Sequence, residues 1–391
     1  MTTSPNVKEV KYLMKLLHQK KQQLSEPLIN IKRELKKKGK LSFVNELTNG
    51  ESSLIQQIRQ QTSSLNINNV TRTKAYLEFY NRHPEVHWAF LGHMVSRNGG
   101  WNMTDLKGGL LTRLLSKKEA ASFFAFLERG NWLIFQDVFP QFLLYEESLK
   151  RNQNLFYLLR HLNVSLFMEV IWNYFWVQHD TYILTVAQII NEQSYLELRV
   201  MKNPIYKKEI FSSLEFKLQD LLSMNHILFP YFFHQQIKLV GKTLHHFESL
   251  HERILLGKRL YSILFSNQNR LNMLTKWATT TPHTGSRKDY WPHIFNDVDE
   301  GLPGSIFKPK LKSCQLLPGA TKIYSPKLEF AWKNVEHGPA EKIDWYKDWR
   351  IIYYLIENDE KAEDKIEEEY CKTLERLELA ANTKKAISHF Y

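Results

Sequence analysis

The chain has 391 residues, of which 43% are hydrophobic and 24% are charged, and its formal net charge is +12. These proportions exclude an intrinsically disordered protein and leave two or three domains, or one large helical body with an appendage. The two cysteines, Cys314 and Cys371, are too few and too far apart for a disulfide framework. We therefore expect packed thiols in a cytoplasmic protein.

The N-terminal region, residues 1–61, predicts a basic head of amphipathic helices. Residues 1–50 contain eleven Lys and Arg against four Asp and Glu, a local charge of +7. Basic residues interrupt the apolar ones here, so no secretory signal is indicated. Positive charge suffices for phosphate contacts, which makes nucleic acid or an anionic membrane surface one interpretation. A solvated helix face is the other, because the head has little aromatic interleaving for base stacking.

Residues 70–275 predict a central helical core, because apolar residues recur there at intervals of three and four. We expect residues 62–69 to form a linker before this core. The longest uncharged stretch, residues 221–237, contains several polar residues and Pro230. This pattern favours two buried helices broken at Pro230 over a transmembrane segment.

Two further regions follow the core. Residues 276–340 hold seven of the thirteen prolines and several large aromatic residues. They predict an irregular but ordered strap over the helical body, with a short hairpin near residues 311–332. Residues 341–391 predict an acidic C-terminal helix. The expected fold class is therefore mainly α, with a multi-helix globular body, an irregular aromatic and proline-rich strap and a C-terminal helix.

Polar side chains are concentrated in one helix of the predicted core that is otherwise apolar. We expect this helix to begin at His83–Pro84, where proline suits the first turn, and to end with Gly99 as its cap. Polar residues near its end and in the segment that follows define a candidate pocket: His93, Arg97, Asn98, Asn102 and Asp105. In one interpretation Arg97 binds an anionic group and His93 acts as an acid or base. In the other, these residues form a buried network that fixes a helix crossing.

A second polar and aromatic group lies in the strap. We interpret it as a candidate lid over the predicted pocket, with ordinary packing as the alternative. The group consists of Arg287, Tyr290, Trp291 and His293.

The histidines give no complete metal site. His83 and His87 have the spacing of metal ligands, but Pro84 stands where a zinc protease places its glutamate, and no third ligand is indicated. A single Glu-x-x-His at Glu248 lacks the second copy that a di-iron bundle needs. The chain also contains no P-loop, dinucleotide fingerprint or nucleophile elbow. We therefore predict no metal site, and no cofactor is indicated.

A long motif supports a family resemblance. The run HPEVHWAFLGHMVSRNGGWNMTDLKGG, with TRTKAYLEFY before it and GSRKDYWPHIF after it, resembles the YppC-like proteins of Bacillus and relatives. The resemblance covers most of the chain, and the family is one of unknown function. It implies a cytoplasmic bacterial protein, and it transfers no catalytic residue, cofactor or partner.

Three functions follow as hypotheses. The first is a non-enzymatic helical interaction protein that contacts a protein partner or a polyanion, because charge is unevenly distributed and no catalytic signature is complete. The second is an enzyme or small-anion-binding protein with a pocket around His93 and Arg97. The third is nucleic-acid binding through the basic head, with an affinity that falls steeply with salt. The sequence decides neither enzyme status nor oligomeric state.

Overall fold

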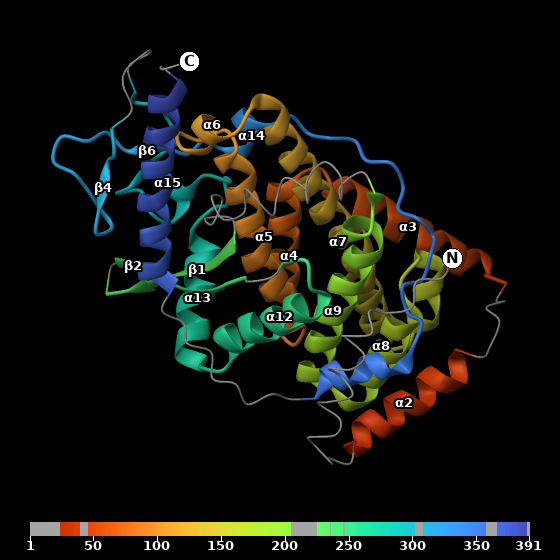
Figure 1. The fold of residues 1–391 in the computed structure, drawn as a ribbon. Coiled ribbons are helices and arrows are strands. Elements are labelled where there is room, and N and C mark those ends of the chain that lie inside the picture. The colour runs from red at the N-terminus through yellow and green to blue at the C-terminus, as the bar shows by residue number, and fades with distance from the viewer. Residues whose placement is uncertain are drawn as a thin grey trace.

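The fold is mainly α-helical, as predicted, and the computed structural model describes residues 24–39, 46–204, 225–234, 236–244, 247–301, 308–356 and 366–388 (Figure 1). The α-helices are α2 (Glu26–Lys38), α3 (Asn49–Leu65), α4 (Asn69–Arg82), α5 (His87–Asp105), α6 (Leu111–Leu114), α7 (Lys117–Arg151), α8 (Leu166–Gln178), α9 (Thr181–Leu196), α12 (Leu250–Phe265), α13 (Gln268–Thr280), α14 (Leu328–Ala331) and α15 (Ile366–Ser388). Other helical turns are the 3₁₀ helices η1 (Phe156–Leu162), η5 (Arg287–Asp289) and η6 (Trp349–Leu355) and the π-helix η2 (Glu197–Met201). The strands are β1 (His226–Phe233), β2 (Gln236–Thr243), β3 (Phe295–Asn296), β4 (Leu311–Lys312), β5 (Gln315–Leu316) and β6 (Ile323–Tyr324).

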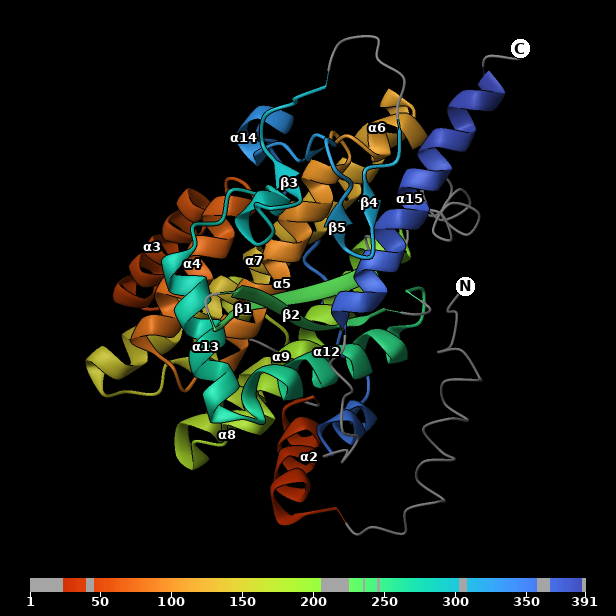
Figure 2. The ribbon, with the colours of Figure 1, turned by 90° about the vertical axis from the view of Figure 1, so that its left-hand side faces the viewer.

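Helix α5 lies at the centre of the molecule. It packs against α4, α7 and α9, and the hairpin β1–β2 lies between it and α12 (Figures 1 and 2). Its side chains Trp88, Phe90 and Trp101 are fully buried, as expected of a helix that is apolar nearly all round. Even so, no described helix combines the length and apolarity needed to cross a membrane.

Capping side chains fix where the long helices begin. Helices α3, α4 and α7 each start with a capping box, in which two side chains bond the free N–H groups of the first turn. The box of α4 joins Asn68 and Thr71. Helix α3 continues to Leu65, with the Thr62 hydroxyl bonded to the carbonyl of Ile58 one turn earlier. The linker predicted over residues 62–69 is therefore too long, since only residues 66–68 separate the two helices.

The predicted end of the central helix at Gly99 is wrong. Helix α5 begins at His87 and continues through Gly99 and Gly100 to Asp105. A Cβ atom on Gly100 would lie 2.3 Å from Asn69 Oδ1 and 2.5 Å from His283 Nε2. The glycine therefore permits close packing of neighbouring side chains and does not terminate the helix.

Residues 226–243 form an antiparallel hairpin, so the prediction of two helices broken at Pro230 is wrong for the described part of that stretch. Strands β1 and β2 pair from His226 opposite Thr243 to Phe233 opposite Gln236. The segment is rich in aromatic and branched residues, which suit strands. Pro230, which has no N–H to donate, is tolerated because both strands of a two-stranded sheet are edge strands.

The strap contains the short hairpin that was expected, β4–β5, whereas the predicted continuous C-terminal helix is wrong over residues 341–356. Residues 341–348 have no regular structure and lead into η6. Arg199 Nη2 donates to the carbonyls of Glu341 and Ile343, both at 2.7 Å. Trp345 Nε1 donates to Asn191 Oδ1 at 2.8 Å. The contacts with Arg199 use backbone carbonyls that a helix would have bonded internally.

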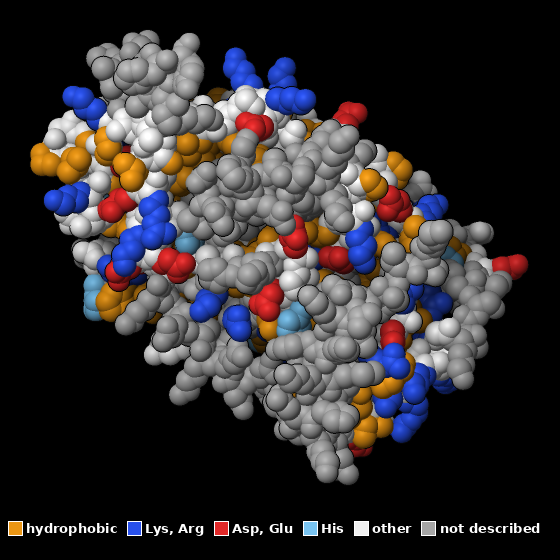
Figure 3. Space-filling view, viewed as in Figure 1, with side chains coloured by type: hydrophobic (Ala, Val, Ile, Leu, Met, Phe, Trp, Pro, Cys, Tyr) orange, Lys and Arg blue, Asp and Glu red, His pale blue; other side chains and the backbone are white. Residues whose placement is uncertain are grey.

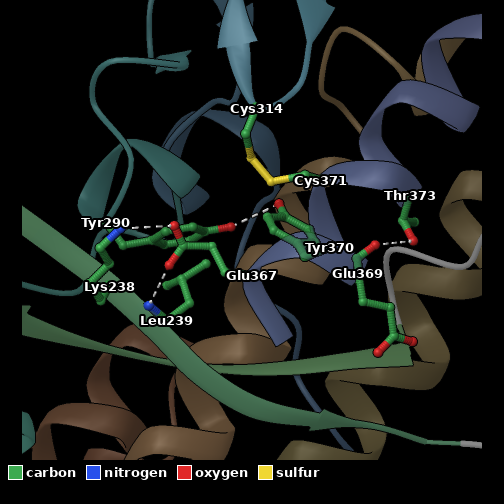
Figure 4. The surroundings of a disulfide bond; sticks show 9 residues. All are labelled: Lys238, Leu239, Tyr290, Cys314, Glu367, Glu369, Tyr370, Cys371 and Thr373. Atoms are coloured by element: carbon green, nitrogen blue, oxygen red, sulfur yellow. Dashed lines mark hydrogen bonds and ion pairs between the residues drawn. A yellow bond between two sulfur atoms is a disulfide. The ribbon is translucent and has the colours of Figure 1, made fainter. Parts of the chain in front are cut away.

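Cys314 and Cys371 form a disulfide, with their Cα atoms 5.3 Å apart, so the expectation of two packed thiols is wrong (Figure 4). The bond joins the turn between β4 and β5 to α15, which also contacts β2 through Glu367. The sequence separation of 57 between the cysteines concealed this proximity, because only folding of the strap against α15 brings them together. The cysteines therefore no longer support the expectation of a reducing, cytoplasmic compartment, which required them to be unpaired.

Helix α2 carries much of the positive charge in the described part of the basic head. Its apolar residues Leu28, Ile31 and Leu35 are buried, and it packs against α8 and η6. Lys and Arg side chains gather on the surface at α2 (Figure 3). Part of this positive charge is neutralised within the protein, since Lys38 forms an ion pair with Glu169 of α8 at 2.5 Å.

Candidate functional site

A cavity of about 280 Å³ lies along α5, between this helix and α7, α9, α12 and the start of β1. For comparison, an engineered apolar cavity of ~150 Å³ is large enough to hold benzene. Most of the described residues that line it are apolar. They include Leu91, Val95, Phe123, Phe126, Ile134, Ile189, Leu196, Phe247, Leu256 and Leu260. The size and lining are typical of a small-molecule site.

Small residues on the surrounding helices leave this space open. Gly130 on α7 lines the cavity, and among the described residues a Cβ atom there would meet only Leu196 Cδ2, at 4.0 Å. Gly92 on α5 has the opposite role, since its Cβ would lie 2.6 Å from the Trp88 ring. The Trp88 indole is therefore packed over the backbone of its own helix, at the edge of the cavity.

Glu192 is an ionisable group in this largely apolar lining. Burial raises the pKa of its carboxyl from 4.5 to about 7, while the nearby Trp88 N–H, the hydrogen bond from Gln193 and the positive charge of Arg253 oppose the rise. The carboxyl is thus close to half protonated at neutral pH. A group in this state can accept or donate a proton in a hydrogen bond to a ligand.

A chain of hydrogen bonds holds the Glu192 side chain in position. Arg253 Nε donates to Gln193 Oε1, and Gln193 Nε2 donates to Glu192 Oε1, both at 3.0 Å. The other nitrogens of Arg253 bond the Phe247 carbonyl and Glu197, both at 2.6 Å. Arg253 is therefore itself fixed by Phe247 and Glu197, and it orients Gln193, which in turn bonds Glu192.

Trp88 and Tyr76 add two hydrogen-bond donors beside Glu192. The Trp88 N–H is buried and has no acceptor at bonding distance in the part of the chain that the structure describes, although its proximity favours the charged form of Glu192. The two rings pack edge to face, with centroids 5.4 Å apart. Burial raises the pKa of the Tyr76 hydroxyl, and the nearby Glu192 adds to the rise. We call Tyr76, Trp88, Glu192 and Gln193 the polar corner of the cavity.

The predicted pocket residues all lie on α5, but they point into different surroundings. Asn98 and Asn102 line the cavity. The Asn98 amide bonds both backbone groups of Leu228, at 2.9 and 2.8 Å, and so continues the pairing of β1 with a side chain. Asn102 accepts from Arg287, which also forms an ion pair with Asp105 at 2.5 Å. Asn102 and Asp105 therefore have Arg287 as their common partner, and of these two residues only Asn102 lines the cavity.

His93 and Arg97 are not among the described residues that line the cavity. His93 Nδ1 bonds the Thr73 carbonyl at 2.8 Å, and burial lowers the pKa of this histidine well below its usual value. Arg97 donates to the Thr281 carbonyl at 2.5 Å, and its guanidinium lies 4.2 Å from the centre of the Trp277 ring. Burial lowers the pKa of Arg97 to about 10, and its buried Nε and Nη1 atoms have no hydrogen-bond partner among the described residues.

The candidate lid residues cover the C-terminal half of α5. Arg287 reaches Asp105 and Asn102, and its Nη1 donates to the Tyr290 hydroxyl at 2.7 Å. That hydroxyl lies 2.9 Å from the Tyr370 hydroxyl of α15 (Figure 4). Trp291 is buried against Tyr370, whereas His293 is exposed. The strap and α5 are thus joined through Arg287.

The sequence interpretation missed the polar corner. Its signal is the run Asn191–Glu192–Gln193, three polar residues near the end of α9, which is otherwise strongly apolar. Trp88 and Tyr76 give no separate signal, because aromatic side chains in helices are usually part of the core. Among the described residues, no group of three or more His, Cys, Asp or Glu is arranged to hold a metal ion.

Comparison with known proteins places the site within a matched region. The family described as "Protein of unknown function (DUF2515)" matches residues 64–375, a range that includes every described residue lining the cavity. The chain is also similar to the uncharacterized protein YppC of Bacillus subtilis (strain 168). The two are 37% identical over 297 residues, which cover 75% of this chain and 83% of YppC. No solved structure matches the chain.

Proposed function

The chain belongs to the DUF2515 family of proteins of unknown function, and we propose that it binds a small, mostly apolar molecule that carries one polar group. The cavity along α5 is the observation that carries this proposal. Its apolar walls would enclose the body of the ligand, and its polar corner would bind the polar group. The proposal is one of binding, and it assigns no reaction.

The energetics of packing support a ligand in this space. Most of the lining is apolar, and apolar surface in contact with water costs free energy. A bound molecule recovers part of that cost, because burial of apolar surface contributes roughly 25 cal/mol per Å² and dispersion contacts add to it.

Hexan-1-ol tests this proposal, because it joins a short apolar chain to one hydroxyl. Isothermal titration calorimetry should show saturable binding to the wild-type protein and to Gly130→Ala, which adds one methyl group in open space. Gly130→Leu should weaken binding at least tenfold by placing a larger side chain in the cavity. Equal binding by all three proteins would place the alcohol elsewhere and overturn the proposal.

A small-anion role for Arg97 is a second candidate, favoured by the two buried nitrogens of its guanidinium that lack partners. A buried guanidinium without a bonded carboxylate is costly, and an anion would offset that cost. Inorganic phosphate should then raise the melting temperature of the wild-type protein more than that of Arg97→Lys. An equal effect on both proteins would contradict this candidate.

An interaction role for the basic head has less support. In its described part, the Lys32 and Lys36 ammonium groups lie 4.2 and 4.7 Å from the centre of the Trp349 ring. These cations therefore help to attach α2 to η6. Contact with a protein partner, nucleic acid or another polyanion stays a proposal, as does the cytoplasmic location that the resemblance implies.

A further inference from the structure

We infer that the ligand of the α5 cavity is an organic cation, an alkyl or arylalkyl amine whose ammonium group pairs with Glu192 beside Trp88 and Tyr76. This inference rests on the proposed binding function and adds the chemical class of the ligand. Three features of the described lining support it: its charge balance, its aromatic residues and the arrangement of its polar corner.

The charge balance of the lining leaves one carboxylate for a ligand. The acidic and basic residues described in the lining are Arg72, Arg253 and Glu192. Arg72 pairs with Glu128 at 2.5 Å, and Arg253 pairs with Glu197 at 2.6 Å. Glu192 has no ion pair among the described residues, and its bond from Gln193 comes from a neutral amide. A cationic ligand would neutralise it, whereas an anionic ligand would meet its like charge.

The aromatic lining suits the same class of ligand. Tyr76, Trp88, Phe123, Phe126 and Phe247 all line the cavity. The face of an aromatic ring attracts a cation, and this attraction strengthens in a site that excludes water. Aromatic rings also bury the hydrocarbon part of an amine, so one set of side chains accommodates both ends of such a molecule.

The polar corner offers an ammonium group a fixed acceptor. One oxygen of Glu192 already accepts from Gln193, whose own carbonyl oxygen is fixed by Arg253. The carboxylate is therefore oriented before a ligand arrives, which reduces the entropy lost on binding. An ammonium donor can form a charge-assisted hydrogen bond with it, and such bonds are about twice as strong as neutral ones.

Three probes with the same six-carbon chain separate this inference from the proposed function. Hexylamine, hexan-1-ol and hexanoate differ only in their polar group. Calorimetry of the wild-type protein at pH 8 should show hexylamine binding roughly tenfold more tightly than hexan-1-ol, and hexanoate more weakly than either. Hexan-1-ol binding at least as tightly as hexylamine would overturn the inference while leaving the proposed function intact. Failure of all three probes to bind would overturn both.

Substitution of the carboxylate tests the same point at the level of the protein. In Glu192→Gln, hexylamine should bind at least tenfold more weakly, while the affinity for hexan-1-ol should change little. Glu78→Gln is the matched control, because it removes an equal charge from an exposed position of α4. The alcohol shows that the Glu192 variant remains folded with an intact cavity. Equal losses of hexylamine affinity in the two variants, or no loss in either, would contradict a role for Glu192.

Discussion

Gln193 Nε2 donates a hydrogen bond of 3.0 Å to Oε1 of Glu192, its neighbour on α9. This contact places an oriented carboxyl group at the edge of a cavity whose walls are mainly apolar. A partly buried carboxyl with mainly apolar surroundings costs stability when it is charged. The proposed ligand would offset part of this cost, and four predictions test the arrangement and the packing around it.

The first prediction concerns pH. Burial raises the pKa of Glu192 to about 7 in the folded protein, from 4.5, so the folded state binds the proton more tightly than the unfolded state. Its contribution to stability is present below pH 4.5 and is lost as the pH rises through 7. The shift corresponds to an upper limit of ~3 kcal/mol at pH 8.

Glu192→Gln should therefore be more stable than the wild-type protein at pH 8, and the difference should shrink toward pH 5. Urea unfolding at both pH values measures it. Burial also raises the pKa of Asp137 to about 7. Asp137 therefore changes the free energy of unfolding with pH in a similar way in both proteins, and its effect cancels in the comparison. A stability difference that is the same at both pH values would contradict this account of Glu192.

The second prediction concerns Gly130. Gly130→Ala should raise the free energy of unfolding by about 1 kcal/mol, because alanine favours the helix and its methyl group meets open space. Thermal denaturation measures this change. Gly257→Ala is the matched control on α12, where the new Cβ would lie 2.5 Å from Ile189 Cγ2 and should destabilise the protein. Destabilisation by both substitutions would mean that the space at Gly130 is filled.

The third prediction concerns the disulfide. Its cysteines are 57 residues apart, and the loss of chain entropy in the unfolded state predicts a stabilisation of about 4 kcal/mol. Dithiothreitol should therefore lower the melting temperature of the wild-type protein. It should leave that of the double variant Cys314→Ser/Cys371→Ser unchanged. Titration of two free thiols in the unreduced, denatured protein would show that the bond does not form.

The fourth prediction concerns the contact between the strap and α5. Arg287 and Asp105 form a buried ion pair, and removal of one partner leaves the other charge uncompensated. Arg287→Ala should lower the free energy of unfolding by about 3–5 kcal/mol. Lys150→Ala, at an exposed ion pair with Glu147, should cost less than about 1 kcal/mol. Similar effects of the two substitutions would contradict a structural role for the Arg287 contact.

Local signals in the sequence predicted the helical class, because periodic apolar residues and capping residues act over a few positions. The hairpin β1–β2 was missed because its run of apolar residues fits a buried helix as well as a strand. Gly99 and Gly100 resembled a helix end, but the reason for glycine is the packing of Asn69 and His283 against α5. Such long-range contacts leave no local pattern.

The candidate site could be predicted from the sequence only in part, because it also depends on long-range contacts. The sequence drew attention to the correct helix, and Asn98 and Asn102 do line the cavity. The polar corner, in contrast, combines Tyr76 of α4, Trp88 of α5 and Glu192 of α9. Their proximity depends on how three helices pack, which the spacing of residues along one helix does not reveal.

The most direct test of a ligand in the cavity follows the Trp88 indole N–H by NMR, with its resonance assigned from Trp88→Phe. Titration with hexylamine or hexan-1-ol should shift this resonance saturably in the wild-type protein and leave it unchanged in Gly130→Leu. An unchanged Trp88 resonance in the wild-type protein with both probes would contradict binding at this site.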